Sequence, residues 1–423
     1  MAKVFLPKGT RDLMPATMNR RLMVISTVRD VFARYGFEPL ETPAFERIET
    51  LTGKYGDEGE KLMFRILKRG EGGKRGEVDQ ALRYDLTVPL ARMMAMNPGI
   101  PLPFKRSQIQ PVWRADRPQR GRFREFYQCD VDTIGTDSPI ADAECIAVVH
   151  DALTALGLTE FTIRVNHIQL LHALAEALGA ADQETSMLQA LDKLDKVGRS
   201  GVEKELLERG FSAEQVRKLW SFMDGAPIPG AAEAEAELRL ILDLARDLGV
   251  DPDRVKLDRT LARGLDYYTG PVFETVLDGE YTGSVSGGGR YDGLIGMFSG
   301  KADIPAVGVS LGIERIFMLM EEMGLMPDTQ TTTQVWATVF SSETRSATLE
   351  AVAVLRQAGI RVQVSTRVGK LGKQFKDASG RGVPFALVCG PDEAAAGTIV
   401  LKNLHTGEQI SGSPAQVASE LGA

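Results

Sequence analysis

Four segments of the chain have the pattern of short β-strands, and they constrain its fold more than any other feature. Each alternates apolar with polar residues or is a short apolar run, and several are joined by Gly-rich or charged loops, as in an antiparallel sheet. These segments are residues 62–67, 104–114, 123–132 and 271–277. We therefore predict that an antiparallel sheet forms the core of the larger part of the chain.

Two other regions predict helices. From residue 17 to residue 35, apolar residues recur at three- and four-residue steps, and Gly36 is a natural C-terminal stop. Residues 166–255 are rich in Ala, Leu, Glu and Lys with helical spacing, as at Leu170, Leu171 and Leu174. We interpret residues 166–255 as an inserted helical region.

The pattern changes after the polar stretch at residues 327–333, which is a linker candidate. Beyond it, predicted strands alternate with predicted helices at residues 343–358 and 370–379. This alternation is typical of an α/β unit with a mixed or parallel sheet, and the segment is long enough to fold as a small separate domain. The predicted strands are residues 335–340, 360–365, 383–389 and 398–402.

Bulk properties exclude several classes of protein. At 423 residues the chain is too long for one ordinary core. No apolar run approaches the roughly 20 residues that cross a bilayer, and no secretory signal is evident, so we expect no membrane partner. Three widely spaced cysteines without a CxxC motif fit a reducing cytoplasm, and four histidines without ligand spacing predict no protein-built metal site. A net charge of −7 argues against a protein that coats nucleic acid, and we expect no DNA partner.

Two Gly-dense runs carry the strongest functional signal. Residues 263–270 read Arg-Gly-Leu-Asp-Tyr-Tyr-Thr-Gly and place one cation beside two rings with hydroxyl tips, between glycines that let the backbone turn sharply. Residues 286–293 read Ser-Gly-Gly-Gly-Arg-Tyr-Asp-Gly. Each run alone is explained equally well as a hairpin loop, because Gly and Asp cluster in ordinary turns. Together they suit a pocket for a small polar molecule that has a ring and a negative charge.

Arginines gather around a predicted strand–loop–strand at residues 112–132. Arg114 lies on the first strand, and Arg122 and Arg124 lie on the return strand, where alternation places Gln128 on the same face. Because the planar guanidinium group matches phosphate oxygens in a bidentate way, these arginines could converge on one triphosphate. The loop between the strands would be free to touch something larger. The alternative interpretation is a solvated charged face.

A second basic patch lies near the end of the chain, and a solvated helix face explains it almost as well as a binding surface does. A Gly-rich phosphate loop is absent, since neither GxxxxGK[ST] nor a helix-opening GxGxxG occurs. A nucleotide would therefore be held by arginines on a sheet. The patch consists of Arg361, Arg367, Lys370, Lys373, Lys376 and Arg381.

Over its whole length the chain resembles the histidyl-tRNA synthetases, a family of class II aminoacyl-tRNA synthetases. Pro43 matches the first class II motif, residues 113–132 match the second motif with its loop, and Gly-Ile-Glu-Arg at 312–315 matches the third. The two Gly-dense runs match the two motifs that are private to the histidine enzymes. The resemblance implies an α+β fold, with an antiparallel sheet flanked by helices, a helical insertion and a C-terminal α/β anticodon-binding domain. It implies a catalytic domain at 1–325, a linker at 326–333 and the anticodon-binding domain at 334–423.

The resemblance also implies an activity and a set of site residues. The protein would be a homodimer that joins L-histidine to tRNA(His) through a histidyl-adenylate, using ATP and Mg²⁺. Arg263 would sit between the histidine carboxylate and the α-phosphate and act in catalysis with Arg114 and Arg315. By position, the other roles are ATP binding by Arg114, Asp116, Arg122, Arg124 and Arg315; histidine binding by Asp85, Leu86, Thr87, Gln128, Asp132, Arg263, Tyr267, Tyr268 and Tyr291; and tRNA contact by Arg117, Gln119 and Arg120.

Two positions depart from the family's common pattern. Asp116 stands where Glu is common, and Tyr-Asp-Leu-Thr-Val at 84–88 stands where many bacterial members have Arg-Pro-Glu-Gly-Thr. Contacts to the ammonium group of the substrate can therefore shift in detail. The alternative function is a non-catalytic, histidine-sensing regulatory subunit, but such paralogues typically lack the terminal domain and parts of the arginine set. A class I synthetase is not indicated, because no His-Ile-Gly-His or Lys-Met-Ser-Lys-Ser segment occurs.

Overall fold

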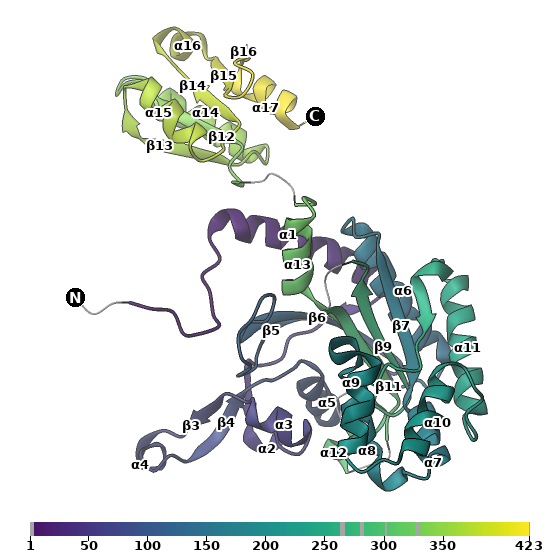
Figure 1. The fold of residues 1–423 in the computed structure, drawn as a ribbon. Coiled ribbons are helices and arrows are strands. Elements are labelled where there is room, and N and C mark those ends of the chain that lie inside the picture. Colours follow the sequence, from purple (N-terminus) through teal and green to yellow (C-terminus); the bar gives the residue numbers. More distant parts are fainter. Residues whose placement is uncertain (1–3, 263–266, 280–282, 301–302, 327–329, 423) are drawn as a thin grey trace. The chain divides into compact units, whose positions relative to one another are not determined.

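The computed structural model describes residues 4–262, 267–279, 283–300, 303–326 and 330–422, with the backbone alone at 56–58 (Figure 1). The chain divides into two compact units. The first comprises Met1–Arg11 and Val24–Leu325, and the second comprises Asp12–Met23 and Met326–Ala423. Among the described residues, no helix is both long and apolar enough to cross a membrane.

An eight-stranded sheet forms the centre of the first unit (Figure 1). Its strands are, in spatial order, β1 (Glu38–Pro39), β5 (Phe104–Trp113), β6 (Glu125–Ile134), β11 (Ala306–Gly312), β10 (Ser284–Arg290), β9 (Pro271–Leu277), β7 (Phe161–His167) and β8 (Val255–Leu257). From β5 to β7 every pair of neighbours is antiparallel. The predicted antiparallel sheet is therefore confirmed, and a parallel strand is added at each edge, β1 beside β5 and β8 beside β7.

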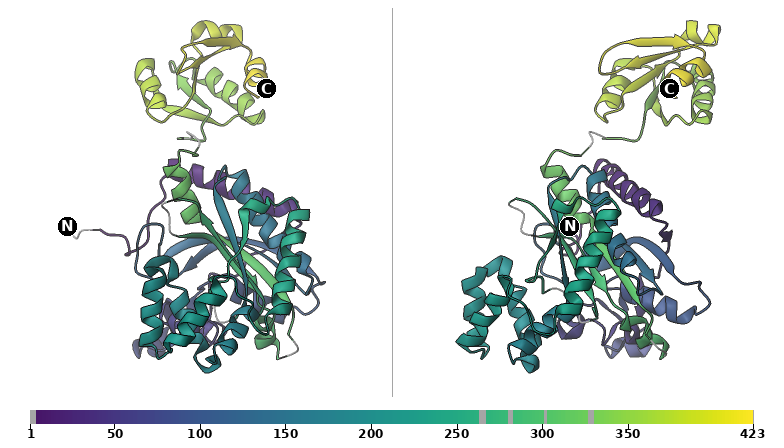
Figure 2. Two further views of the ribbon diagram at one scale, coloured as in Figure 1. Left: turned by 45° about the vertical axis from the view of Figure 1, so that its right-hand side comes forward. Right: turned by 90° about the vertical axis from the view of Figure 1, so that its right-hand side faces the viewer.

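Helices pack against this sheet, as Figure 2 shows from two further sides. The predicted first helix is confirmed as α1 (Pro15–Arg34), and Gly36 follows it with φ +74°, a conformation that glycine adopts readily. Helix α6 (Pro139–Ala155) begins with Pro139 and contacts β6, β10 and β11. The Arg290 guanidinium of β10 holds it there by donating to both carboxylate oxygens of Asp142, with Nε–Oδ1 at 3.2 Å.

Between β7 and β8 the chain forms a run of helices. Helix α10 begins with a capping box in which Ser212 and Gln215 satisfy each other's backbone N–H groups, so its start is encoded locally. Helix α11 packs against α6 and joins the helical region to the sheet. The helices are α7 (Ile168–Ala177), η1 (Ala181–Gln183), α8 (Glu184–Leu191), α9 (Leu194–Glu208), α10 (Ala213–Met223), α11 (Ala232–Asp247) and η2 (Pro252–Arg254).

A separate three-stranded sheet lies near the start of the chain and has the order β2 (Phe45–Arg47), β4 (Val78–Leu82), β3 (Arg65–Leu67). The strand predicted at 62–67 is thus shorter than expected and does not join the central sheet. Helix α3 (Gly56–Lys61) ends immediately before it, and β3 pairs with β4 across the short α4 (Gly70–Lys74). Helices α2 (Ile48–Leu51), α5 (Thr87–Met96), α12 (Gly293–Ser299) and α13 (Ile313–Glu322) complete this unit.

The second unit contains a five-stranded mixed sheet, as the alternating pattern predicts. Its order is β13 (Val362–Val368), β12 (Val335–Val339), β14 (Phe385–Val388), β15 (Ile399–Asn403) and β16 (Gln409–Gly412). The first three strands are parallel, and the last two pairs are antiparallel. The helices of this sheet are α14 (Arg345–Gln357), α15 (Leu371–Ser379), α16 (Pro391–Ala396) and α17 (Pro414–Gly422).

Candidate active site

One face of the central sheet carries a group of polar side chains, which we call the polar floor. The antiparallel register of β5, β6 and β11 brings same-face residues of the three strands opposite one another. The polar floor consists of Arg106, Gln108 and Gln110 on β5, Gln128, Asp130 and Asp132 on β6, and Ser310 on β11. Most of these groups are buried, so each needs a partner inside the protein or from a ligand.

Arg106 lies on β5 opposite Asp132, at one end of the polar floor, and is fully buried. Its Nη2 is 2.7 Å from Asp132 Oδ2 and 3.9 Å from Asp130 Oδ2, and its Nη1 donates to Gln108 Oε1. Burial raises the pKa of Asp130 to about 7, because Arg106 only partly offsets the loss of solvation and Asp132 adds repulsion. With both carboxyls ionised, these three groups carry one excess negative charge.

The Asp132 carboxylate is fixed from both sides. The Tyr291 hydroxyl donates to its Oδ1, while Arg106 pairs with its Oδ2. Gly308 of β11 makes room for it, since a Cβ at position 308 would lie 2.0 Å from Asp132 Oδ1. The requirement for glycine here depends on strand pairing, so no local sequence signal indicates it.

Three buried acceptor oxygens in or near this floor have no hydrogen-bond partner among the described residues, Asp85 Oδ2, Gln128 Oε1 and Asp132 Oδ2. Asp132 Oδ2 is nevertheless ion-paired with Arg106. The other Asp85 oxygen, Oδ1, accepts from the Tyr55 hydroxyl at 3.0 Å and from the Val88 backbone N–H at 3.1 Å. A buried acceptor without a donor costs about 1–3 kcal/mol, so such oxygens are expected where a ligand supplies the donor. The segment also contains Leu86, which is fully buried, and Thr87, which is half-buried at the first residue of α5.

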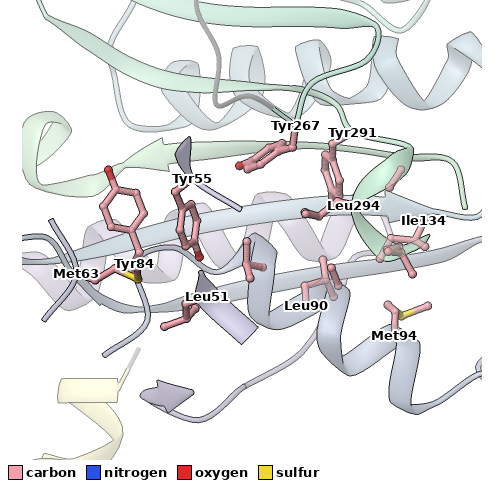
Figure 3. Close-up of a cluster of buried hydrophobic side chains, with 14 of the residues drawn as sticks. Leu51, Tyr55, Met63, Tyr84, Leu90, Met94, Ile134, Tyr267, Tyr291 and Leu294 are labelled. Atoms are coloured by element: carbon pink, nitrogen blue, oxygen red, sulfur yellow. The ribbon is translucent and has the colours of Figure 1, made fainter. Parts of the chain in front are cut away.

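Buried tyrosines line the same region (Figure 3). The ring centroids of Tyr267 and Tyr291 are 5.9 Å apart, and those of Tyr55 and Tyr84 are 4.7 Å apart. Tyr268 is half-buried and packs edge-on against Tyr267 at 5.0 Å. Burial raises the pKa of Tyr55, Tyr267 and Tyr291 well above the ordinary value, so all three present neutral hydroxyl groups.

Arg114 follows β5 and is held over aromatic rings. Its guanidinium carbon lies 4.3 Å from the centroid of Tyr84 and 5.3 Å from that of Phe126, and its Nε donates to the Tyr84 carbonyl. Asp116 orders Arg122 and Arg124 of the same segment. Its carboxylate pairs with Arg122 at 2.7 Å, and its carbonyl accepts from Arg124 Nε at 3.0 Å. Arg114, Arg122 and Arg124 are therefore held in place by protein groups.

Arg315 lies in the first turn of α13, directly after β11. Its Nη1 donates to the carbonyl and hydroxyl oxygens of Ser284, the first residue of β10. The C-terminal ends of β5 and β11 and the N-terminal ends of β6 and β10 lie at the same end of the sheet. Arg114 and Arg315 are thus at one end of the sheet, whereas Arg263 is outside the described residues.

The residues expected to contact tRNA lie on the loop between β5 and β6. Arg117, Gln119 and Arg120 are all exposed, and Arg120 forms an ion pair with Glu322 of α13. In the second unit, Lys370 immediately before α15 is exposed, as are Lys373 and Lys376 on that helix. The rest of that basic patch has internal partners, such as Asp377 for Arg367 at 3.2 Å and the Trp336 ring for Arg381.

Several residues that sequence reasoning did not single out support the site. Arg83 is buried and donates to the carbonyl oxygens of Thr42 and Pro43 and to Gln110 Oε1, so it anchors the first-motif segment to β5. Arg106 and Gln108 could have been found by applying strand alternation to residues 104–114, because a buried strand with alternating polar residues is unusual. No signal within the sequence places Ser310 or Tyr55 beside them.

Among the described residues there is no group of three or more His, Cys, Asp or Glu side chains that could together hold a metal ion. The donor set of the region is instead guanidinium, amide, hydroxyl and carboxylate groups on a sheet. Such a set suits a small zwitterion beside a phosphorylated molecule.

Comparisons with known proteins agree with this geometry. A family model described as histidyl-tRNA synthetase matches residues 9–316, and one described as an anticodon binding domain matches residues 334–423. The chain is 41% identical to the histidine--tRNA ligase of Cytophaga hutchinsonii over 97% of both chains. It is 42% identical to that of Aeropyrum pernix, over 96% of this chain and 94% of the relative.

A solved structure is also similar over the full length. The crystal structure of histidyl-tRNA synthetase from Nostoc sp. PCC 7120 matches with a TM-score of 0.86 and 32% identity, covering 100% of this chain and 99% of that chain. The family model covers well over half of the chain, and the relatives match it nearly from end to end. The chain therefore belongs to the histidyl-tRNA synthetase family.

Proposed function

We infer that the protein attaches histidine to tRNA(His). It is an enzyme that activates histidine with ATP as a histidyl-adenylate, releases pyrophosphate, and then transfers the histidyl group to tRNA with release of AMP. The observation that carries this proposal is the pair of buried, unpartnered oxygens, Asp85 Oδ2 and Gln128 Oε1, near the fixed Asp132–Tyr291 pair. An α-ammonium group and an imidazole ring supply donors of the kind that these groups lack.

In this proposal the polar floor and the tyrosines bind the amino acid. Asp85, Thr87 and Gln128 take the ammonium group, while Asp132, Tyr267, Tyr268 and Tyr291 surround the imidazole ring. Buried hydrogen-bonding groups reject an apolar competitor strongly, because they would remain unpaired against it. Specificity for histidine then follows from the desolvated carboxylate of Asp132 and its neighbouring hydroxyl groups.

The arginines would hold ATP. Activation is an in-line attack by the histidine carboxylate on the α-phosphorus, so negative charge gathers between the substrates. Fixed cations stabilise that charge better than water does, because they need no reorganisation. Arg114 and Arg315, already held against Tyr84 and Ser284, are suited to the phosphates, with Asp116, Arg122 and Arg124 beside them.

Arg263 is proposed as the cation at the reacting centre. An arginine stays protonated, so it acts by charge and position and not as an acid or base. Mg²⁺ would enter on the phosphates of ATP and supply further positive charge there. Alignment of the two substrates contributes much of the remaining acceleration.

The proposed domain plan assigns residues 1–325 to catalysis, with a helical insertion at about 166–255, residues 326–333 to a linker and residues 334–423 to anticodon binding. The exposed residues Arg117, Gln119 and Arg120 are candidates for tRNA contact. A homodimer and a cytoplasmic location belong to the proposal and come from the family resemblance and the cysteine usage.

ATP–pyrophosphate exchange with each amino acid in turn tests the proposal. Exchange should depend on L-histidine and on Mg²⁺, and charging should require tRNA(His). Exchange that is independent of histidine would rule out the ligase function. Histidine binding without any exchange would instead favour a histidine-sensing regulatory subunit.

A further inference from the structure

We propose that Asp130 and Ser310 are positioning residues that orient the side-chain amide of Gln128, so that its oxygen faces the ammonium group of the substrate. This inference rests on the proposed function and deepens it. Asp130 and Ser310 would select which end of the Gln128 amide, oxygen or NH₂, faces the ammonium group.

The three side chains form a connected chain across two strands. Gln128 and Asp130 are two residues apart on β6, and Ser310 is opposite Asp130 on β11. Gln128 Nε2 donates to Ser310 Oγ at 3.0 Å and lies 3.5 Å from Asp130 Oδ1. Gln128 Nε2 is therefore the nitrogen that both Ser310 Oγ and Asp130 Oδ1 face.

The direction of this chain follows from which groups can donate. An ionised carboxylate only accepts, so the end of the Gln128 amide that faces Asp130 Oδ1 must be its NH₂ group. Ser310 Oγ accepts from the same nitrogen, and the two contacts hold the NH₂ end of the amide against the polar floor. The opposite end of the amide, Gln128 Oε1, is buried and has no hydrogen-bond partner among the described residues. It is therefore available to accept from an N–H donor of the substrate.

The arrangement depends on the charge of Asp130. The charged groups around Asp130 are Arg106 on β5 at 3.9 Å, Asp132 on the same strand, and Asp85 in the segment before α5. The pKa of Asp130 is raised to about 7, chiefly by burial. Below that pH the protonated carboxyl can itself donate, and it then favours the amide oxygen of Gln128 on the side that faces it. The amide reverses, and its NH₂ group meets the substrate's ammonium group.

Histidine affinity should therefore fall as the pH decreases through about 7. An asparagine at position 130 makes the reversed arrangement permanent, because its own NH₂ group can donate to the amide oxygen of Gln128. Ser310→Ala removes the hydrogen bond from Gln128 Nε2 without reversing the amide, and Ser310→Thr preserves the hydroxyl that accepts it. Thr133→Val is the matched control, since it removes a buried hydroxyl from the opposite face of the same strand.

The experiment measures histidine-dependent ATP–pyrophosphate exchange from pH 6 to 8.5 in the full-length variants, with thermal melting to verify folding. For Asp130→Asn we expect a KM for histidine raised about 10- to 100-fold, as for the loss of a hydrogen bond to a charged group. Its kcat at saturating histidine and its KM for ATP should change less than about threefold, and its KM for histidine should no longer vary near pH 7. Ser310→Ala should show a smaller increase, Ser310→Thr should have a lower KM for histidine than Ser310→Ala because it keeps the hydroxyl, and Thr133→Val should behave as wild type.

A KM for histidine and a pH profile that stay at wild-type values in Asp130→Asn would overturn the inference. If Asp130→Asn does not fold, the contrast between Ser310→Ala and Ser310→Thr decides, and equal KM values for these two would likewise overturn it. Failure of the proposed function is distinguishable, because it would appear in the wild type as exchange that does not depend on histidine.

Discussion

Replacing Asp85 with Asn is the most direct test of the ammonium-binding site. The Asp85 carboxyl is 2% exposed, and its Oδ1 already accepts from the Tyr55 hydroxyl and the Val88 N–H. Those two donors would hold the carbonyl oxygen of an asparagine at the Oδ1 position. Its NH₂ group would then occupy the position of Oδ2, where the substrate's ammonium group needs an acceptor.

The magnitude follows from the loss of a buried charge partner. Removing one member of a buried ion pair costs about 3–5 kcal/mol, because the other charge is left without compensation. At about 1.4 kcal/mol per factor of ten, kcat/KM for histidine should fall roughly 10²-fold to several 10³-fold. Tyr55→Phe is the graded control, because it removes one donor from Oδ1 and leaves Oδ2 in place. We expect a loss of only about tenfold there, as for one ordinary hydrogen bond.

The effect of Asp85→Asn on the free energy of unfolding should differ from its effect on catalysis. Burial raises the pKa of Asp85, so the wild type loses stability as the pH rises from the unfolded value of about 4 through the raised folded pKa. Asp85→Asn has no such ionisation, and its free energy of unfolding should vary less over that range. Pyrophosphate exchange gives kcat/KM, and urea denaturation at several pH values gives stability. A variant whose kcat/KM remains within threefold of wild type would show that Asp85 does not bind the ammonium group.

Three further predictions concern other parts of the site. Gly308→Ala would place a Cβ 2.0 Å from Asp132 Oδ1, so KM for histidine should rise at least tenfold in exchange assays, and an unchanged KM would contradict the tight fit. Asp142→Asn leaves the buried Arg290 without its bidentate partner and should lower the unfolding free energy by about 3–5 kcal/mol in denaturant titrations; a change below 1 kcal/mol would refute the structural role of this pair. Arg263→Ala should slow adenylation by about 10³-fold or more in single-turnover assays while ATP still binds, and near-normal rates would mean that another cation acts at the reacting centre.

The local sequence pattern was sufficient to predict many of the strands and helices. Alternation and turn residues predicted β5, β6 and β9 to within a few residues, and the helical period with its glycine stop predicted α1. These features depend on neighbours in the chain, so they can be inferred without knowing the partner strands. The alternation of strands and helices likewise predicted the mixed sheet of the second unit.

The motifs in the sequence also indicated most of the candidate site. The sequence could place Gln128 and Asp132 on one face of one strand, because side chains alternate along any strand. It could not show that β11 would lie between β6 and β10 and bring Gly308 and Ser310 against that face. It also could not show that the predicted strand at 62–67 would pair in a separate small sheet.

The sequence by itself therefore determined which segments become strands and helices, and which types of group are available for chemistry. The tertiary structure alone decided that Arg106 is buried between two carboxylates and that Asp85 and Gln128 each keep one oxygen unpartnered. Periodicity is a property of consecutive residues, whereas ion pairing, the direction of a hydrogen-bond chain and the space left by a glycine depend on strands that pair across long stretches of sequence.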